Sequence, residues 1–214
     1  MKTTDFPQGS EAWLQVRAGV ITASRAKDAR SRLKPLKGET VGKPSAKMLA
    51  YAKQVAVERI AQRPVDKFFE TWQMKEGQIE ESNARQAYEA DSGAFVDEAG
   101  FITTDDGIFG YSADGLIGED GLLEVKSLFS SERIVDLIGE RDVSDFRDQC
   151  LMGFFVTGRK WIDVVLWAPA LKNINREKTV VRIARDEDEM YLFEQDMLFF
   201  KALADKYETQ LRSI

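Results

Sequence analysis

The sequence contains no histidine and a single cysteine among its 214 residues. Without histidine, the Ser-His and Cys-His forms of nucleophilic catalysis are excluded, and so are zinc sites built on imidazole. Cys150 cannot form a disulfide within the chain, and its apolar neighbours predict a buried thiol. A hydrolase built from these residues must use carboxylates, lysine and a metal ion that prefers oxygen ligands, for which magnesium or manganese is the natural choice.

Long apolar runs are also absent. The first residues include no apolar segment of the signal-peptide kind, and no later stretch approaches the length needed to span a membrane. Apolar residues make up 43% of the chain and charged residues 31%, which is typical of a globular protein in water. We therefore expect a cytoplasmic protein, and 214 residues suffice for one domain with a full core.

The charge is unevenly distributed along the chain. The net formal charge of −6 by itself argues against an anionic partner. Between residues 25 and 53, however, nine Lys and Arg residues accompany only two acids, Asp28 and Glu39. Such an excess indicates a local surface for a polyanion on an otherwise acidic protein, and a solvated basic loop is the alternative.

The residues most suited to chemistry lie between positions 110 and 127. Apolar residues around 122–125 predict a strand entering the core, and Glu124 and Lys126 share one of its faces because they are two residues apart. Asp114 lies at a preceding turn, and a fold-back there would bring its carboxylate towards Glu124. Two carboxylates about 4 Å apart repel by roughly 4 kcal/mol at an effective dielectric constant near 20, so a shared divalent cation would stabilise them. A salt bridge on an edge strand is the alternative reading.

The periodicity of the remaining chain predicts a mixture of helices and short strands. Four β segments separated by Gly and Asp turns predict a meander, at residues 94–96, 101–103, 108–111 and 121–126. The nearly continuous apolar run 161–167 predicts a central strand covered on both faces, and 180–183 predicts a further strand. Helices are predicted at residues 11–17, 45–62, 77–90, 130–138, 144–158 and from 187 onwards, with Ser10, Ser130 or Ser131, and Asp186 as N-caps.

Ser24 is predicted to be the N-cap of a short helix that begins close to Arg17. A helix start beside a cation is suited to a phosphate group. In the alternative, Ser24 only caps the helix and Arg17 pairs with an acid.

Several of these segments, in this order, resemble phage lambda exonuclease and its relatives. These proteins are alkaline exonucleases of viral recombination systems, within the Asp…Glu-x-Lys nuclease superfamily. The resemblance is carried by residues 8–13, 17–24, 77–81, 112–115 and 123–126 and by Gln149. It implies an α/β fold with a restriction-endonuclease-like core, in which helices flank a central mixed β-sheet. The whole chain, 1–214, is then a single nuclease domain with its core at about 75–185, on which N-terminal helices (10–62) and a C-terminal helix (186–212) pack.

The resemblance also implies a role for individual residues. Asp114, Glu124, the backbone carbonyl of Val125 and Glu81 would hold two Mg²⁺ ions, with Mn²⁺ as a possible substitute. Lys126 would orient or deprotonate the attacking water with support from Gln149, and the pocket for the 5′ phosphate would consist of Arg17, Ser24 and Ser112. The proline that often precedes the aspartate in the superfamily is Ala113 here.

The activity implied by the resemblance is processive 5′-to-3′ digestion of linear double-stranded DNA. Relatives release 5′ mononucleotides, leave a 3′ single strand for a single-strand annealing protein, and assemble as ring-shaped homotrimers. Two alternatives remain open in the sequence: a structure-specific or restriction-type endonuclease with the same core, and an inactive DNA-binding module.

Overall fold

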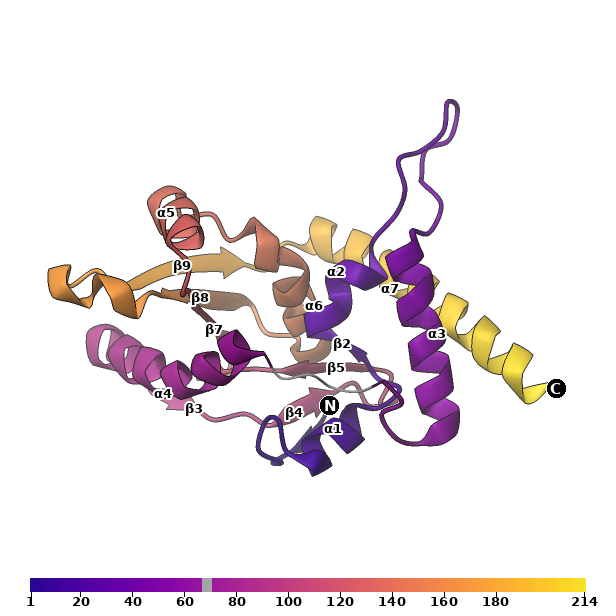
Figure 1. The fold of residues 1–214 in the computed structure, drawn as a ribbon, viewed down its shortest axis with the longest axis horizontal. Coiled ribbons are helices and arrows are strands. Elements are labelled where there is room, and N and C mark those ends of the chain that lie inside the picture. The colour runs from indigo at the N-terminus through magenta and orange to yellow at the C-terminus, as the bar shows by residue number, and fades with distance from the viewer. Residues whose placement is uncertain (67–70) are drawn as a thin grey trace.

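The computed structural model describes residues 1–66 and 71–214, which form two β-sheets with helices around them (Figure 1). The four-stranded sheet has the spatial order β1 (Lys2–Thr4), β4 (Phe101–Thr103), β5 (Phe109–Ser112) and β2 (Ile21–Thr22). The five-stranded sheet has the order β3 (Val96–Asp97), β6 (Gly115–Ile117), β7 (Gly121–Ser127), β8 (Trp161–Trp167) and β9 (Lys178–Ala184). Both sheets contain parallel and antiparallel pairs, and the predicted α/β fold with mixed sheet pairing and flanking helices is confirmed.

Seven α-helices and three short 3-10 helices connect and cover the strands within the described residues. The α-helices are α1 (Glu11–Arg17), α2 (Ala26–Ala29), α3 (Ala46–Ala61), α4 (Trp72–Ser92), α5 (Ser131–Glu140), α6 (Arg147–Thr157) and α7 (Glu187–Arg212). The 3-10 helices are η1 (Ala23–Arg25), η2 (Ser144–Phe146) and η3 (Pro169–Ile174). None of the helices in the described part of the chain is long and apolar enough to cross a membrane.

The five-stranded sheet is covered on both faces. Leu123, Val125 and Val165 point to α4, whereas Leu122 and Val164 point to the main core, which α6 and the four-stranded sheet complete. β7 and β8 are parallel, so the chain must return between them, and α5 and α6 form this connection. The prediction of a central strand at 161–167 is confirmed, since β8 lies between β7 and β9.

Local sequence signals locate the helix starts well. The side chains of Ser10, Ser45, Ser130 and Asp186 each accept a hydrogen bond from the backbone N–H three residues later. Such a bond satisfies a backbone donor that has no partner within the helix. The predicted cap at Ser24 is wrong: Ser24 lies inside η1, which begins after Thr22 without a side-chain cap.

The predicted meander is also wrong. β4 and β5 pair with each other in the four-stranded sheet, whereas β3 pairs with β6 in the five-stranded sheet. The strand β6 was not predicted, because its three residues between two turns carry no periodic signal of their own. Turn residues mark where strands end, but they do not say which strands pair.

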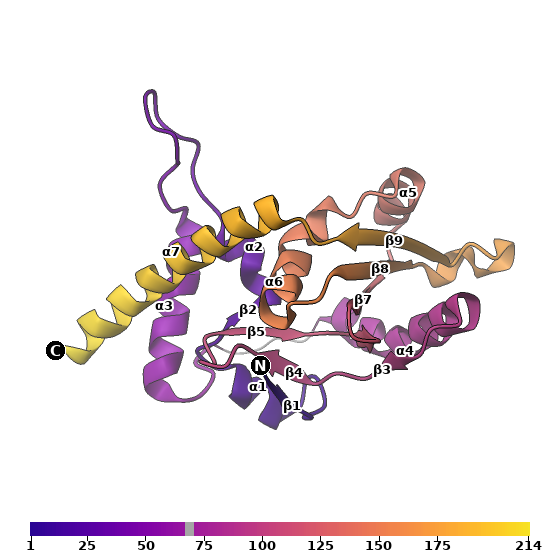
Figure 2. The ribbon, with the colours of Figure 1, turned by 180° about the vertical axis from the view of Figure 1, so that it is seen from behind.

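The remaining elements gather at one end of the molecule. α3 and α7 pack against each other, and Figure 2 shows α7 crossing α3. Residues 33–43 project from this end as a narrow hairpin, which a bridge between Arg32 and Pro44 closes at its base (Figure 1).

Two side chains of α3 hold the turn that follows α1. The backbone N–H of Gly19 donates to Oε2 of Glu58 at 3.1 Å, and Nε of Arg59 donates to the carbonyl of Gly19 at 3.0 Å. Gly19 has a φ of +76°, and a Cβ there would lie 2.9 Å from the backbone nitrogen of Arg59. Both the conformation and the close approach therefore require glycine at this position.

We predict that Gly19→Ala lowers the free energy of unfolding by about 2 kcal/mol or more, because it adds a steric clash to the strain of a left-handed conformation. Gly158→Ala is the matched control, since Gly158 has a φ of +70° but no neighbour within 4 Å of its Cβ position. It should cost only about 1 kcal/mol. Urea denaturation measures both, and equal losses would contradict the proposed role of the contact with α3.

Candidate active site

The site is organised around the segment in which the chain passes from one sheet to the other. Ser112 ends β5 and pairs with Phe101, whereas Gly115 begins β6 and pairs with Leu123. β6 and β7 are antiparallel, so Asp114 comes to lie beside the strand that carries Glu124. Oδ2 of Asp114 accepts the backbone N–H of Val125 at 2.7 Å, and the expected fold-back is therefore confirmed.

Glu124 is a buried carboxylate, with 2% of its surface exposed. Its Oε1 accepts hydrogen bonds from Nζ of Lys126 at 2.8 Å and from Nε2 of Gln149, and its Oε2 accepts the hydroxyl of Tyr111 at 2.6 Å. A buried carboxylate is tolerated only when its oxygens have such partners. Because β7 lies between β6 and β8, the alternative of a salt bridge on an edge strand is wrong.

Lys126 is held in a fixed direction. Its Nζ donates to Glu124 and, at 3.0 Å, to Oε1 of Gln149, which projects from α6. Burial lowers the pKa of Lys126, but the carboxylates of Glu124 and Asp114 outweigh this effect, so the pKa lies above its ordinary value. The two carboxylates therefore favour the ammonium form of this side chain.

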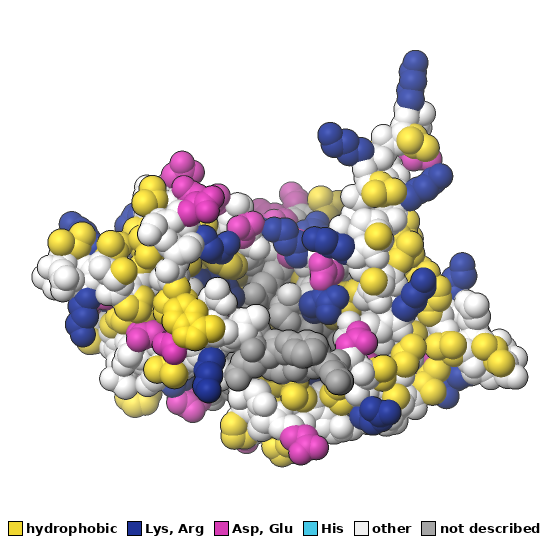
Figure 3. Space-filling view, viewed as in Figure 1, with side chains coloured by type: hydrophobic (Ala, Val, Ile, Leu, Met, Phe, Trp, Pro, Cys, Tyr) yellow, Lys and Arg dark blue, Asp and Glu magenta, His cyan; other side chains and the backbone are white. Residues whose placement is uncertain are grey.

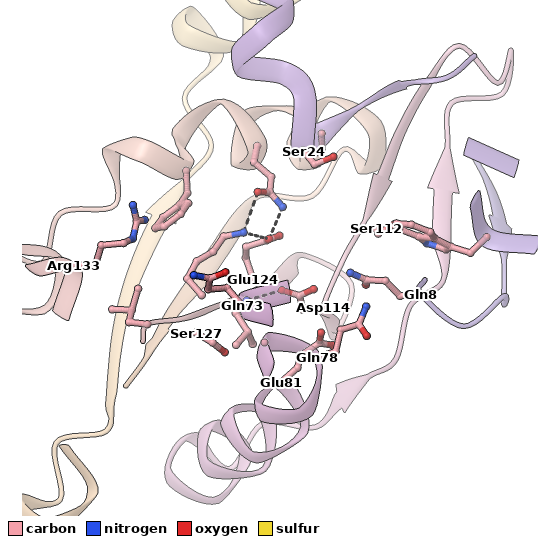
Figure 4. A pocket seen from close by; sticks show the side chains of 18 of the residues that line it. Gln8, Ser24, Gln73, Gln78, Glu81, Ser112, Asp114, Glu124, Ser127 and Arg133 are labelled. Atoms are coloured by element: carbon pink, nitrogen blue, oxygen red, sulfur yellow. Dashed lines mark hydrogen bonds and ion pairs between the residues drawn. The ribbon is translucent and has the colours of Figure 1, made fainter. Parts of the chain in front are cut away.

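These residues line a cleft of about 440 Å³. Figure 4 shows Asp114, Glu124 and Glu81 projecting into this cleft from the crossing between the sheets, from β7 and from α4. Val125, Lys126 and the other predicted residues Gln149, Arg17, Ser24 and Ser112 also line it. The structure thus brings together in one cleft every residue predicted for the site.

Two of these carboxylates, Asp114 and Glu81, have a raised pKa. Burial raises the pKa of Asp114 well above its ordinary value, and the charges of Glu124 and Glu81 add to this shift. Burial also raises the pKa of Glu81, with Arg85 opposing the shift and Glu124 reinforcing it. A positive charge between these groups would relieve both the desolvation and the repulsion.

The residues fit a hard divalent cation, although the described chain contains no group of three or more acidic or cysteine side chains already arranged around a metal position. In their present rotamers Asp114 turns one oxygen to the N–H of Val125 and Glu124 turns both to neighbouring donors. The side-chain atoms in the cleft that could bind a metal ion are the carboxylate oxygens of Asp114, Glu124 and Glu81. Magnesium and manganese prefer such oxygen ligands.

A second polar group lies next to the carboxylates. Nη1 of Arg17 donates to Oγ of Ser112 at 3.1 Å, and Nη2 donates to Oγ of Ser24 at 3.2 Å. The guanidinium also stacks on Trp13, 3.9 Å from the ring centroid, and the indole N–H donates to Ser112 at 3.3 Å. In residues 1–66 and 71–214 no carboxylate forms an ion pair with Arg17, and burial lowers its pKa to about 10.

Arg17, Ser24 and Ser112 therefore form a cluster of donors without a paired acid in the described chain. The alternative in which Arg17 pairs with an acid and Ser24 only caps a helix is not what the structure contains. A guanidinium held in this way by neutral hydroxyls is suited to receiving an anion, because it presents fixed donors to a planar or tetrahedral oxyanion.

Tyr111 and Trp13 contribute hydrogen bonds to the site that were not predicted from the sequence. Tyr111 lies in an apolar strand, where a tyrosine is expected to be a core residue, and nothing nearby in the sequence points to Glu124. Trp13 lies within a segment that carries the family resemblance, but its indole contact with Ser112 joins residues 99 positions apart. This hydrogen bond could be foreseen only if the packing of α1 beside β5 were already known.

Comparison with known proteins agrees with this geometry. Residues 12–160 match the YqaJ-like viral recombinase domain. The structure is similar to an alkaline exonuclease, LHK-Exo, from Laribacter hongkongensis, with a TM-score of 0.80 and 26% identity over 95% of this chain and 97% of that one. It is also similar to LHK-Exo in complex with dAMP (TM-score 0.78, 24% identity, 95% of both chains). A phage-related exonuclease from Haemophilus somnus 129PT has the same fold (TM-score 0.69, 14% identity, 91% of this chain and 95% of that one). No curated protein sequence matches the chain.

The family match and the similarity to LHK-Exo, together with the α/β fold of mixed sheets flanked by helices, identify a nuclease of the alkaline exonuclease type. The chain belongs to the YqaJ-like viral recombinase family, and the resemblance to lambda exonuclease is confirmed. Metal dependence is general among nucleases of this family.

The carboxylate cluster predicts how the stability of the metal-free protein, in the presence of a chelator, depends on pH. The folded-state pKa of Asp114 is raised, so the folded protein binds a proton more tightly than the unfolded chain does. Stability is then lost as pH rises from the ordinary aspartate value of about 3.9 through the raised folded value. We expect Asp114→Asn, which still offers an oxygen to Val125, to flatten this dependence and to raise the melting temperature at neutral pH. Calorimetric melting from pH 4 to 8 measures it, and a lower melting temperature for the variant throughout would contradict the repulsion.

Proposed function

We propose that this protein is a metal-dependent exonuclease that digests linear double-stranded DNA processively from 5′ ends. It releases 5′ mononucleotides and leaves a 3′ single strand for annealing-type recombination. Two Mg²⁺ ions, which Mn²⁺ can replace, are held by Asp114, Glu124, the carbonyl of Val125 and Glu81. Arg17, Ser24 and Ser112 bind the 5′ phosphate. The family and the exonuclease-like fold support this proposal.

One observation carries most of the proposal: the anion receptor and the carboxylates meet on a single short segment. Ser112 contacts Arg17, and Asp114 lies two residues later beside β7. Two residues of extended backbone span at most about 7 Å. This is close to the spacing of neighbouring phosphates in one strand, so a terminal phosphate on Ser112 and Arg17 would leave the next phosphate near Asp114. Release of single nucleotides follows from that spacing.

The electrostatics of Arg17 favour a strand end over an internal position. A terminal phosphate monoester carries a charge of about −1.5 to −2 at neutral pH, whereas an internal diester carries one negative charge. A guanidinium without a paired acid in the described chain gains more from the more highly charged group. This favours an exonuclease over a restriction-type endonuclease with the same core.

The residues of the cleft have different roles in the proposed hydrolysis. Bound between the carboxylates, the divalent cations would offset the charge of the phosphate oxygens and acidify water. Lys126, which donates to Glu124 and Gln149 and lines the cleft, can orient the attacking water or stabilise the developing charge. Gln149 holds both Lys126 and Glu124, so it keeps the relative positions of these two groups.

The assembly is proposed from the family resemblance alone. Relatives that digest DNA processively form rings of three chains, and we expect a homotrimer here, together with a single-strand annealing protein as partner. Sedimentation equilibrium of the purified protein measures the first of these directly.

The decisive prediction concerns DNA ends. Wild-type protein in Mg²⁺ should release mononucleotides from linear duplexes, faster with 5′ phosphate than with 5′ hydroxyl ends, and should leave closed circular duplex intact. Chelator or Asp114→Ala should abolish cleavage. Arg17→Met should reduce the preference for 5′ phosphate by about 10- to 100-fold, because it removes hydrogen bonds to a charged group worth about 1.5–3 kcal/mol.

Other outcomes of the same assay select the alternatives. Cleavage of closed circles would indicate an endonuclease, and the absence of any Mg²⁺-dependent cleavage by the wild type would indicate an inactive DNA-binding module. Cleavage that persists in Asp114→Ala would contradict the assignment of the site.

The basic segment between residues 25 and 53 is proposed to contact the DNA backbone. Its basic residues before position 33 are paired with acids, and the lysines of the projecting hairpin are the ones we test. Arg25, Lys27, Arg30 and Arg32 all pair with acids, namely Asp28, Asp145, Asp148 and Asp196. Lys34, Lys37 and Lys43 of the hairpin have no ion pair with any described residue. Figure 3 shows basic side chains, in dark blue, projecting along this hairpin, whose basic residues are all lysines.

We predict that charge reversal of the three hairpin lysines to glutamate weakens DNA binding and flattens its salt dependence. Each lysine that contacts a phosphate contributes about 0.9 to the slope of log K against log salt. Reversal of Lys172, Arg176 and Lys206 to glutamate, outside the hairpin, is the control for total charge. Fluorescence anisotropy over a salt series measures the slope, and an unchanged slope would exclude the hairpin from the DNA interface.

A further inference from the structure

Tyr111 lies on β5 of the four-stranded sheet and contacts Glu124, which lies on β7 of the five-stranded sheet. Its side chain is fully buried, and its hydroxyl donates to Oε2 of Glu124 at 2.6 Å. The ring lies against α6, where a Cβ on Gly153 would come within 3.1 Å of it. The direction of the hydroxyl is therefore fixed by packing that does not involve the cleft.

The hydrogen bonds of Glu124 leave little of the carboxylate available. An ionised carboxylate has about four lone-pair positions, two on each oxygen. Lys126 and Gln149 both donate to Oε1, and Tyr111 donates to Oε2. One position remains, on Oε2, and a cation that binds without displacing these donors must bind there.

Resting on the proposed function, we infer that Tyr111 is a positioning residue that orients Glu124 as a metal ligand through one defined oxygen. Tyr111 stops the carboxylate from rotating, because rotation would break a hydrogen bond to a ring that cannot follow. It also prevents both oxygens of Glu124 from turning to one cation. Partners of this kind typically contribute 10- to 100-fold to metal affinity.

The chain contains a matched tyrosine that has no such role. Tyr88 on α4 donates to Oδ2 of the buried Asp163 at 2.6 Å, the same distance as in the Tyr111 pair. Arg182 donates to both oxygens of Asp163 at 2.7 Å. Neither Tyr88 nor Asp163 lines the active-site cleft, so this network stabilises the packing of α4 on the five-stranded sheet.

The test compares Tyr111→Phe with Tyr88→Phe in the full-length protein. Both substitutions keep the ring and remove one hydroxyl, so neither opens a large cavity. Mn²⁺ binding is measured by titration calorimetry, without DNA, at a temperature at which circular dichroism shows each variant folded. The Mg²⁺ concentration for half-maximal cleavage and the preference for 5′ phosphate are measured on linear duplexes.

We expect Tyr111→Phe to weaken Mn²⁺ binding by about 10- to 100-fold and to raise the required Mg²⁺ concentration by a similar factor. Its preference for 5′ phosphate should stay at the wild-type level. Tyr88→Phe should lower the melting temperature and leave Mn²⁺ binding unchanged. Wild-type Mn²⁺ affinity in Tyr111→Phe, or an equal loss in both variants, would overturn the inference while leaving the proposed function standing. If the wild type binds no divalent cation and cleaves no DNA, the proposed function and the inference about Tyr111 are both wrong.

Discussion

The arrangement of this protein depends on where the backbone passes between its two sheets. β5 pairs with β4 as far as Ser112, and β6 begins to pair with β7 at Gly115. Ser112 therefore remains beside Arg17 of the N-terminal region, whereas Asp114 is already beside the strand of Glu124. A short piece of chain thus joins the cluster of Arg17 and Ser112, which we propose binds a phosphate, to a carboxylate pair, and their separation is set by the covalent backbone. The Arg17–Ser112 cluster and the carboxylate pair therefore need not lie on the same sheet.

The burial of Glu124 imposes the second constraint. Leaving a buried carboxylate without partners would cost several kcal/mol, so donors must arrive from the surrounding elements. They come from β5, β7 and α6, through Tyr111, Lys126 and Gln149. The contacts that make this acid tolerable are therefore the same contacts that join the two sheets and the helix between them. Stability and function cannot be separated at this point of the fold.

The arginines of the N-terminal region illustrate how partners decide what a charge does. Arg30 and Arg32 each pair with Asp196 of α7, so they connect the N-terminal segment to the C-terminal helix. Arg17 instead contacts two hydroxyls and an indole ring, with no acid paired to it in the described chain. A paired arginine stabilises the fold, whereas this one keeps its capacity for an external anion. The amino-acid composition alone does not distinguish these three arginines.

Local features of this protein can be inferred from its residues alone. The predicted caps at Ser10, Ser130 and Asp186 involve neighbours three residues apart, and the approach of Asp114 to Glu124 needs only one tight hairpin. The division of the strands between two sheets could not be foreseen, nor could the hydrogen bond from Tyr111 to Glu124, or the position of Ser24 inside a 3-10 turn beside Arg17. Capping and hairpin signals act over a few residues of backbone. Sheet partners and buried hydrogen bonds are selected by packing between segments distant in sequence, so only the folded chain decides them.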